Sequence, residues 1–344
     1  MNGRRINKKT ALIVVGCFLC SLVVAAYVIF YFPNSFSPSP KFITVSKGQS
    51  FSSVVDSLYE KGIIASKTTF SLAGRLLGVT HTMRVGKYSF VSGVSNHDIL
   101  SDIAYGFSSI STTVTLQEGL RSTLYARILK RHLGIDSVRF MELLRDTSLI
   151  GIYPHNSLSL EGYLMPDTYE FFWQDDEKQI IQQMITEFRM FFVDTLQQRM
   201  KKLGLTLNDV LTMASIVEGE AVYDDERPII AGVYYNRLRI RMPLQADPTV
   251  QYAVADVPRR LTRNDLKVDS PYNTYLRYGL PPGPINNPSR KSILAALYPA
   301  KHSYLYFVSD NNGRHRFAKT YQEHQRNVRL YKKARQLAQN GKNL

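Results

Sequence analysis

The sequence predicts an α+β protein with a single N-terminal transmembrane helix, a small α+β domain and a larger mixed α+β domain. Three observations lead to this prediction. An apolar run without charge covers residues 11–32, and a segment rich in proline and serine follows at 33–40. Residues 41–106 and 112–344 then alternate between strand-like and amphipathic helical stretches. With 344 residues, 44% of them hydrophobic, the chain can bury two such cores.

The apolar run at 11–32 has the length of a membrane-spanning helix. At about 1.5 Å per residue it extends over roughly 33 Å, enough to cross the hydrocarbon core of a bilayer. The apolar region of a cleaved signal peptide is shorter, about 7–15 residues, so we favour a retained helix. Four basic residues within 1–10 predict a cytoplasmic N-terminus in the plasma (inner) membrane, with everything after the helix extracytoplasmic or periplasmic. The segment at 33–40 is expected to be an extended spacer.

Charge and cysteine usage narrow the possible partners. The net charge is +15, but twelve of these charges lie in residues 1–10 and 314–344. A nucleic-acid enzyme more often carries a basic stripe through its working domain, so no nucleic acid is expected as a partner. The basic C-terminal stretch could contact anionic lipid or wall polymer, or be a solvated helix face. Cys17 and Cys20 lie in the apolar run, so no disulfide framework or thiolate zinc site is expected beyond it.

Residues 41–106 show the pattern of a small α+β domain. We expect, in order, a strand in 41–51 with a turn at Gly48, helices in 52–62 and 70–78, a strand in 84–91 and a helix in 95–106 capped by Ser95 or Asn96. The opening "VSKGQSF" and the helix after it resemble a LysM module, which is a glycan-binding fold. A purely structural spacer domain is the alternative.

The region from residue 112 onward begins with a strand that ends at Glu118-Gly119. Helices are expected at 123–134 and, as one long amphipathic element, at 177–204. The buried side of the long helix should hold Ile181, Met184, Ile185, Phe188 and Phe192. Between these helices, "LEGYLMPDTYEFFW" at 160–173 mixes aromatic residues with glycine and proline and could line a groove.

A carboxylate stands inside a core-like segment, "LTMASIVEGEA", at 211–221. Thr206 and Asp209 form a plausible capping arrangement for this helix. At helical spacing Glu218 falls on the apolar stripe, whereas Glu220 points elsewhere. The stripe comprises Leu207, Val210, Leu211, Ala214, Val217, Glu218 and Ala221.

A glutamate on an apolar stripe can serve chemistry or structure. An apolar environment favours the protonated form of a carboxyl, and a carboxyl that holds its proton near neutral pH can act as a general acid. The structural alternative is a buried salt bridge, for which Arg237 or Arg239 are candidate partners.

The segments that follow predict two more helices and a long loop. Asp224 or Asp225 could cap a helix that runs to residue 239, with Pro228 in its first turn. Gln245 lies in a turn, and Asp247-Pro248 begins the next helix. Residues 270–289 are rich in Tyr, Asn, Gly and Pro and should form a loop. Tyrosines stack on sugar rings and amides bond hydroxyls, so this loop is typical of a glycan cleft, or else of an ordinary surface.

Several ordered motifs resemble one family. "ASIVEGEA", "YYNRLRIRMPLQADPTVQYA", "YNTYLRYGLPPGPINNP", "PAKHSYLYFV" and "EGYLMPDTYEF" together resemble the endolytic murein transglycosylases, the MltG/YceG-like family. The resemblance runs from the anchor to about residue 330 and assigns the catalytic role to Glu218. It implies a substrate-binding role for Glu220, Asn236, Gln245, Asp247, Tyr252, Asn273 and Tyr275. The family usually reads E-K-E-T where this chain has Glu218-Gly219-Glu220-Ala221.

The resemblance implies a lyase that acts on peptidoglycan glycan strands. Glu218 would protonate the oxygen between N-acetylmuramic acid and N-acetylglucosamine and then accept the proton of the muramic C6 hydroxyl. The product would be a 1,6-anhydro end, formed without water, which would terminate strand elongation. The larger domain, 112–344, would then be the catalytic domain. No cofactor or metal is expected, and H-E-x-x-H and G-x-S-x-G motifs are absent. Peptidoglycan synthases are the implied protein partners.

Two other functions are compatible with parts of the sequence. A non-catalytic peptidoglycan-binding scaffold for wall synthases would need the same anchor and LysM-like domain. A membrane-tethered nucleic-acid binder would act through the basic tail from Arg314 onward.

Overall fold

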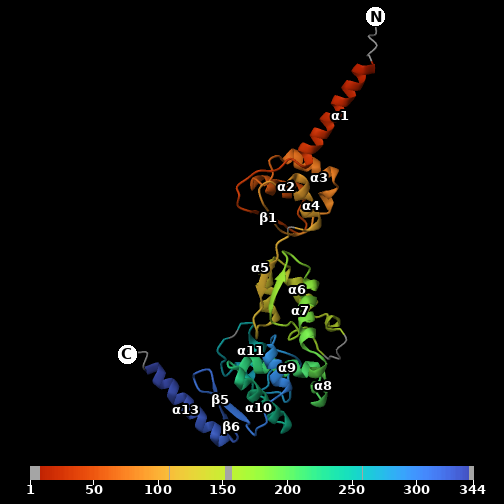
Figure 1. The fold of residues 1–344 in the computed structure, drawn as a ribbon. Coiled ribbons are helices and arrows are strands. Elements are labelled where there is room, and N and C mark those ends of the chain that lie inside the picture. Colours follow the sequence, from red (N-terminus) through yellow and green to blue (C-terminus); the bar gives the residue numbers. More distant parts are fainter. Residues whose placement is uncertain (1–7, 108, 152–156, 258, 341–344) are drawn as a thin grey trace. The chain divides into compact units, whose positions relative to one another are not determined.

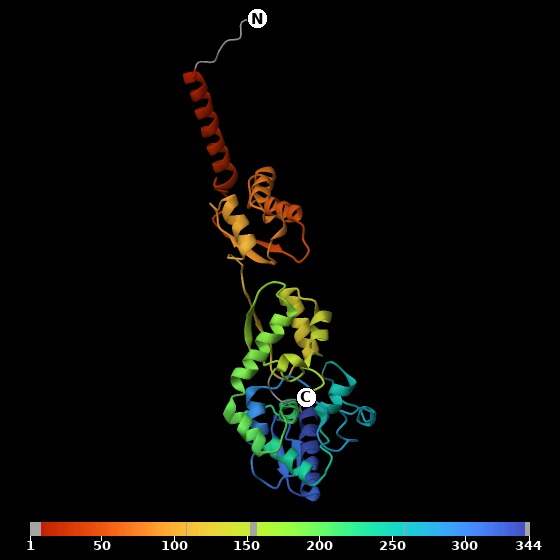
Figure 2. The ribbon, with the colours of Figure 1, turned by 90° about the vertical axis from the view of Figure 1, so that its right-hand side faces the viewer.

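The computed structural model describes residues 8–107, 109–151, 157–257 and 259–340. The chain forms two compact units. The first holds residues up to 113 together with 132–134 and 170–175, and the second holds the others. Figures 1 and 2 show the elements of both units as a ribbon.

The N-terminal element is the helix α1, Lys8–Phe30. Within the described residues it is the one helix long and apolar enough to cross a membrane, with a mean hydropathy of 2.8. None of its residues is buried by the rest of the protein. Its last turn nevertheless packs on the small unit, because Ile29 and Phe30 contact the core and Asn96 donates from Nδ2 to the carbonyl of Ile29 at 2.8 Å.

The proline- and serine-rich segment does not stand free as a spacer. The backbone N–H of Asn34 donates to Val94 at 2.8 Å, and the Asn34 side chain is buried. The backbone N–H of Phe36 donates to the hydroxyl of Ser92 at 2.9 Å. The spacer predicted at 33–40 is therefore bonded, over residues 34–36, along the small unit.

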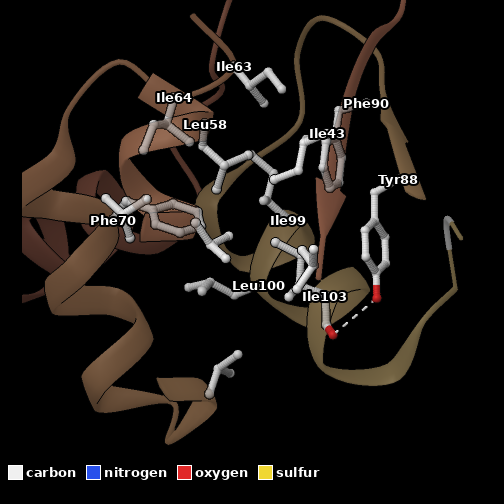
Figure 3. Close-up of a cluster of buried hydrophobic side chains, with 14 of the residues drawn as sticks. Ile43, Leu58, Ile63, Ile64, Phe70, Tyr88, Phe90, Ile99, Leu100 and Ile103 are labelled. Atoms are coloured by element: carbon white, nitrogen blue, oxygen red, sulfur yellow. Dashed lines mark hydrogen bonds between the residues drawn. The ribbon is translucent and has the colours of Figure 1, made fainter. Parts of the chain in front are cut away.

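The small unit contains the two strands and three helices that the sequence predicts, and one short 3-10 helix besides. In chain order the elements are β1 (Lys41–Val45), α2 (Phe51–Glu60), α3 (Lys67–Leu76), the 3-10 helix η1 (Val79–His81), β2 (Gly86–Phe90) and α4 (Asn96–Tyr105). β1 and β2 pair antiparallel, with Lys41 opposite Phe90. Ser95 caps α4 in a capping box with Asp98. The strands and helices enclose one apolar core, in which Phe70 and Ile99 are fully buried (Figure 3).

The remaining elements begin with β3. They are β3 (Thr112–Thr115), α5 (Ser122–Leu133), α6 (Ser137–Leu143), η2 (Thr147–Ile150), β4 (Thr168–Phe171), α7 (Glu177–Phe191), α8 (Asp194–Lys202), α9 (Leu207–Glu220), η3 (Asp224–Glu226), α10 (Arg227–Arg239), α11 (Asp247–Val254), η4 (Asp265–Lys267), α12 (Arg290–Leu297), β5 (Tyr306–Ser309), β6 (His315–Ala318) and α13 (Tyr321–Asn340). β3 pairs with β4, and β5 pairs with β6. The mixed α and β content agrees with the predicted class.

Helix α9 is the centre of the second unit. Thr206 and Asp209 form its capping box, as predicted. The helix is buried on all sides rather than along one stripe, because α10, α11 and α12 pack against it. Between Leu207 and Val217 only Asp209 is not buried. A helix enclosed in this way holds its last turn, with Glu218, in a fixed position.

One predicted helix and one predicted helix cap were wrong. The stretch 177–204 is two helices, α7 and α8, because Phe192 leaves the helical conformation with ψ +61° while its ring stays buried against Phe188. Helix α10 does carry Pro228 in its first turn, but no side chain caps it. Asp224 instead accepts hydrogen bonds from Arg227 and Lys291.

Candidate active site

The Glu218 side chain is 7% exposed, and one of its oxygens accepts two hydrogen bonds and forms an ion pair. Oε2 accepts from the backbone N–H of Ser289 at 2.9 Å and from the Ser289 hydroxyl at 2.5 Å. The ion pair joins Oε2 to Nη1 of Arg227 at 3.1 Å. Hydrogen bonds from charged and backbone donors fix a carboxylate in one orientation. Glu218 is therefore a positioned group, with Oε2 committed to the protein.

Three helix ends bring these groups together. Glu218 lies in the last turn of α9, and Arg227 is the first residue of α10. Ser289 caps α12, where its Oγ accepts from the backbone N–H of Ser292 at 3.2 Å. The start of a helix leaves backbone N–H groups free and carries partial positive charge, so it stabilises the negative charge on Glu218. Arg227 adds a full charge and is tied to the same helix by a 2.6 Å bond to Ser292 Oγ.

The predicted surroundings of Glu218 were wrong in two ways. Its carboxylate meets an ion pair and hydrogen-bond donors, so it does not lie against a purely apolar wall. Its cationic partner is neither Arg237 nor Arg239. Nε of Arg237 donates to the carbonyl of Leu305 at 2.7 Å, and Nη1 of Arg239 donates to Oδ1 of Asn236 at 3.1 Å.

The other oxygen of Glu218 faces the turn after β3. A Cβ at Gly119 would lie 3.4 Å from Cγ of Glu218 and 4.0 Å from Oε1. Gly119 has φ +73°, a conformation that side chains with a Cβ disfavour, and its N–H donates to the carbonyl of Asn287 at 2.9 Å. Among the residues that the structure describes, none donates a hydrogen bond to Oε1. This oxygen is the one left for chemistry.

Two cavities adjoin this position. The first, of about 530 Å³, is lined by residues that include Gly119, Gly219, Glu220 and Asn286. The second, of about 670 Å³, is lined by residues that include Glu118, Asp167, Arg290 and Lys291. Gly219 and Glu220, which follow Glu218 in the chain, thus line the first cavity, and Glu118 lines the second. Glu218 itself lines neither cavity.

The first cavity collects three of the predicted binding residues: Glu220, Asp247 and Tyr252. A fourth, Tyr275, joins them through its hydroxyl, which donates to Oδ1 of Asp247 at 2.6 Å. The guanidinium of Arg121 lies 4.1 Å from the ring centre of Tyr252, so an aromatic face and a cation share one wall.

Glu220 is partly buried and lines this cavity. Its Oε1 accepts from the hydroxyl of Tyr234 at 2.9 Å. Loss of contact with water, opposed by the Tyr234 bond, raises the pKa of Glu220 to about 7.

The other three predicted binding residues do not line either cavity. Asn236 donates from Nδ2 to the carbonyls of His302 and Tyr304, both at 2.9 Å, which joins α10 to the chain before β5. Asn273 is fully buried and donates to the carbonyls of Leu266 and Val268, at 3.1 and 2.8 Å. Asn236 thus holds α10 against residues 302–304, and Asn273 holds the loop at 270–289 against residues 266–268.

Gln245 is exposed and has φ +49°, a left-handed conformation that is uncommon for a residue with a Cβ. Its backbone N–H donates to the carbonyl of Thr274 at 3.0 Å. Residues 270–289 form a loop, as predicted, but Ile285, Asn286 and Asn287 are buried, so it is not an ordinary surface loop.

Asn287 was not predicted as a site residue, and it organises the wall around Glu218. Its backbone and Nδ2 both donate to the carbonyl of Leu120, at 3.0 and 3.1 Å, and its Oδ1 accepts from Gly162 at 2.9 Å. Its Nδ2 also lies 3.4 Å from Oε1 of Glu161. Asn287 thus joins the turn after β3, the "EGYLMPDTY" segment and the residues just before Ser289.

Glu161 is a buried carboxyl in the segment "EGYLMPDTYEF". It was not among the predicted site residues. Its Oε1 accepts from the backbone N–H of Ser122 at 2.9 Å. Burial raises the pKa of Glu161 to about 7, although the Ser122 bond and the charge of Arg121 oppose the rise. The signal that could have found it is a charged residue in a segment otherwise patterned for burial.

Glu118 is a second carboxyl at the site, and it was also missed. It is exposed and lines the second cavity. Partial burial and the negative charge of Glu218 raise its pKa, while Arg227 and Lys291 oppose the rise. The described residues include no group of three or more His, Cys, Asp or Glu that could hold a metal ion.

Comparison with known proteins identifies the family of this chain. The model of the YceG-like family matches residues 43–330. The chain belongs to the YceG-like family. Among its relatives is the endolytic murein transglycosylase of Bacillus subtilis, 35% identical over 304 residues that cover 84% of each chain. The endolytic murein transglycosylase of Streptococcus pneumoniae is 29% identical over 84% of this chain and 58% of its own length.

A solved YceG-like structure has the same fold. The crystal structure of a YceG-like protein from Listeria monocytogenes superposes with a TM-score of 0.59 at 31% identity, covering 84% of this chain and 99% of that one. At Gly219 of this chain a Cβ would lie 2.7 Å from Cβ of Pro248, too close for any larger residue without a shift of the chain.

Proposed function

We propose that this protein is a membrane-anchored endolytic murein transglycosylase, a lyase that cuts peptidoglycan glycan strands between N-acetylmuramic acid and N-acetylglucosamine. The observation that carries the proposal is Glu218: Oε2 is bound by Arg227 and Ser289, while no described residue donates to Oε1. Membership of the YceG-like family and the names of its relatives support the same substrate class.

The reaction needs two proton transfers and no water. The bond from C1 of the muramic residue to O4 of the next sugar breaks as O4 receives a proton. The C6 hydroxyl of the same muramic residue loses its proton, and O6 forms the new bond to C1. The product is a 1,6-anhydro end. Only a single carboxyl oxygen at the right distance is needed for the second transfer, and Oε1 of Glu218 supplies it.

Two cavities, lined by the neighbouring residues Gly119 and Glu118 respectively, favour cleavage within a strand. A strand that is cut internally must extend beyond the broken bond in both directions, so it needs space on both sides of the catalytic group. The cavities of about 530 and 670 Å³ supply that space. Tyr252 and Arg121, which stack on each other in the first cavity, offer aromatic and hydrogen-bonding groups to a sugar. Internal cleavage of a growing strand would terminate its elongation.

The N-terminal parts would bring the enzyme to its substrate. Helix α1 would anchor the chain with residues 1–7 in the cytoplasm and the body outside. The order β1, α2, α3, β2 in the small unit supports a LysM-like, glycan-binding role. Peptidoglycan synthases, which make new strands at the membrane, are the protein partners we expect.

Digestion of purified glycan strands tests the proposal. Mass spectrometry of the released ends should show muramic residues that lack one water relative to hydrolytic ends. Glu218→Gln should lower turnover by about 10²–10⁴-fold or more, the range for loss of an acid–base group. Glu142→Gln, on the exposed face of α6, is the matched control and should behave as wild type. Release of hydrolytic ends would contradict the proposal. Strand binding without turnover, in the wild type as well as in the variants, would also contradict it and would indicate a non-catalytic scaffold.

A further inference from the structure

The arginine that pairs with Glu218 stands at a helix start without a side-chain cap. Arg227 is the first residue of α10, and Glu226 precedes it at the cap position, but no side chain bonds the free N–H groups of the first turn. Such bonds normally hold the start of a helix in place. The contacts of the Arg227 guanidinium with Glu218 and Ser292 orient the end of that side chain. The main chain at 226–227 is held in another way.

His315 holds this main chain through Glu226. The backbone N–H of His315 donates to Oε1 of Glu226 at 3.0 Å, and Nδ1 of its ring donates to Oε2 at 2.8 Å. A carboxylate only accepts hydrogen bonds, so Nδ1 carries the hydrogen. The side chains of Glu226 and His315 are 5% and 9% exposed. Loss of one partner would leave the other buried and unpaired, which is costly, so the contact holds firmly.

The β5–β6 hairpin fixes His315 in turn. His315 is the first residue of β6 and lies opposite Ser309 in the strand pairing. The turn before it is closed by Asp310, whose N–H donates to the carbonyl of Arg314 at 2.8 Å and whose Oδ1 accepts from the N–H of Arg314 at 3.1 Å. The ring of Phe307 meets the imidazole edge to face, with ring centres 5.2 Å apart. The histidine therefore projects from an internally bonded hairpin.

The other ion pairs between residues 224–226 and distant segments lie at the surface. Asp224 pairs with Lys291 at 2.5 Å, and Asp225 pairs with Arg314 at 2.8 Å, with each of these side chains at least 45% exposed. Exposed ion pairs contribute little to stability. The buried contact between Glu226 and His315 is therefore the one we expect to determine where α10 begins.

We propose that His315 is a positioning residue for the transglycosylase reaction. It holds Glu226, Glu226 fixes the first residue of α10, and Arg227 then pairs with Oε2 of Glu218, which leaves Oε1 for the proton transfers. The inference rests on the function proposed above. It gives the β5–β6 hairpin a part in catalysis, although no described residue of the hairpin lines either of the two cavities.

Two replacements separate hydrogen bonding by His315 from the filling of space. His315→Asn keeps an N–H donor close to the place of Nδ1 and loses the ring, whereas His315→Leu keeps apolar volume beside Phe307 and loses the donor. On glycan strands, His315→Leu should lower kcat by roughly 10- to 10²-fold, as a displacement of up to about 1 Å can do, with KM unchanged. His315→Asn should keep most of the wild-type kcat.

Asp225→Asn is the matched control, because it removes an exposed carboxylate from the same segment and leaves Glu226 in place. It should behave as wild type. If His315→Leu were more active than His315→Asn, the packing of the ring would be what matters, and the proposal would be wrong. Thermal unfolding of each variant shows whether it is folded at the assay temperature.

A double-mutant cycle tests whether the effect passes through Arg227. In the Arg227→Gln background the guanidinium that His315 positions is absent, so the further change His315→Leu should alter kcat by less than about twofold. Equal fold losses from His315→Leu in both backgrounds would overturn the proposal, because the histidine would then act independently of Arg227.

The same four proteins distinguish this inference from the proposed function. Failure of the proposed function removes strand turnover from the wild type itself, and the cycle is then measured as shifts of the urea midpoint. Coupled positions should shift the midpoint together by less than the sum of the single shifts, and additive shifts would show that His315 does not position Arg227. Failure of the inference alone leaves wild-type turnover intact and makes both cycles additive.

Discussion

At the scale of single residues, the two oxygens of Glu218 have different tasks. Oε2 receives donors from the first residue of one helix and the cap of another. Such a carboxylate cannot turn freely, and the free oxygen is held toward Gly119. Preorganised groups of this kind lower the cost of rearrangement during the reaction.

Replacement of Arg227 tests how much its ion pair with Glu218 contributes to the stability of the fold. Arg227→Gln leaves Glu218 buried without its cation, and breaking a buried pair costs about 3–5 kcal/mol. We expect the free energy of unfolding, measured in urea, to fall by about that amount. The double variant Glu218→Gln, Arg227→Gln should regain part of the loss, because no unpaired charge remains.

The exposed Arg239 provides the control for that measurement. Arg239→Gln removes an arginine from the other end of the same helix and should change stability by about 0.5 kcal/mol or less. Equal losses from the two arginine variants would show that the pair with Glu218 is unimportant for stability.

At the scale of elements, the turn between β3 and α5 places the backbone of Gly119 next to Glu218, at the end of α9. Gly119→Ala should be strained by about 1–2 kcal/mol at φ +73°. The added methyl group would lie in ordinary contact with Cγ of Glu218 and 4.0 Å from Oε1, where it would narrow the space beside this oxygen, so kcat should also fall. Turnover and thermal unfolding of the variant measure the two effects separately.

Gly279 is the matched control for Gly119. It has φ +87°, and a Cβ there would meet open space. Gly279→Ala therefore carries similar backbone strain without touching the site, and its kcat should equal that of the wild type. A similar loss of kcat in both glycine variants would contradict the role given to the turn.

The sequence predicted features that lie within one helix. It did not predict which distant segments contact one another. The capping box at Thr206 and the apolar spacing around Glu218 lie within one helix, so local pattern predicted them. Arg227, Ser289 and Glu118 come from three other segments, and spacing along one helix does not tell which distant helix start will face it. The pattern also missed that α9 is enclosed on all sides, since full burial leaves no polar face to give a period.

At the scale of the whole molecule, buried carboxyls make stability depend on pH. The pKa of Glu161 is raised to about 7, against about 4.5 for an ordinary glutamate. A raised pKa contributes stability that is fully present below the ordinary value and is lost as pH rises through 7. The melting temperature should therefore fall between pH 5 and pH 8, with a loss of about 3 kcal/mol from this group.

Glu161→Gln should flatten that dependence, because a neutral amide has no proton to lose. The variant should equal or exceed the wild type in melting temperature at pH 8 while gaining nothing at pH 5. Glu142→Gln, exposed on α6, should keep the wild-type slope. A slope unchanged by Glu161→Gln would show that the buried carboxyl does not titrate in this range.

The bonding of the segment after α1 to the small unit has a mechanical consequence. Asn34 and Phe36 tie the chain to that unit directly after the apolar helix, and Ile29 packs on its core. No flexible linker separates α1 from the small unit. A tilt of α1 would therefore rotate the small unit with it. In a membrane, a change in the tilt of α1 would thereby change the orientation of this unit relative to the membrane surface, and a mismatch between helix length and lipid thickness is one cause of tilt.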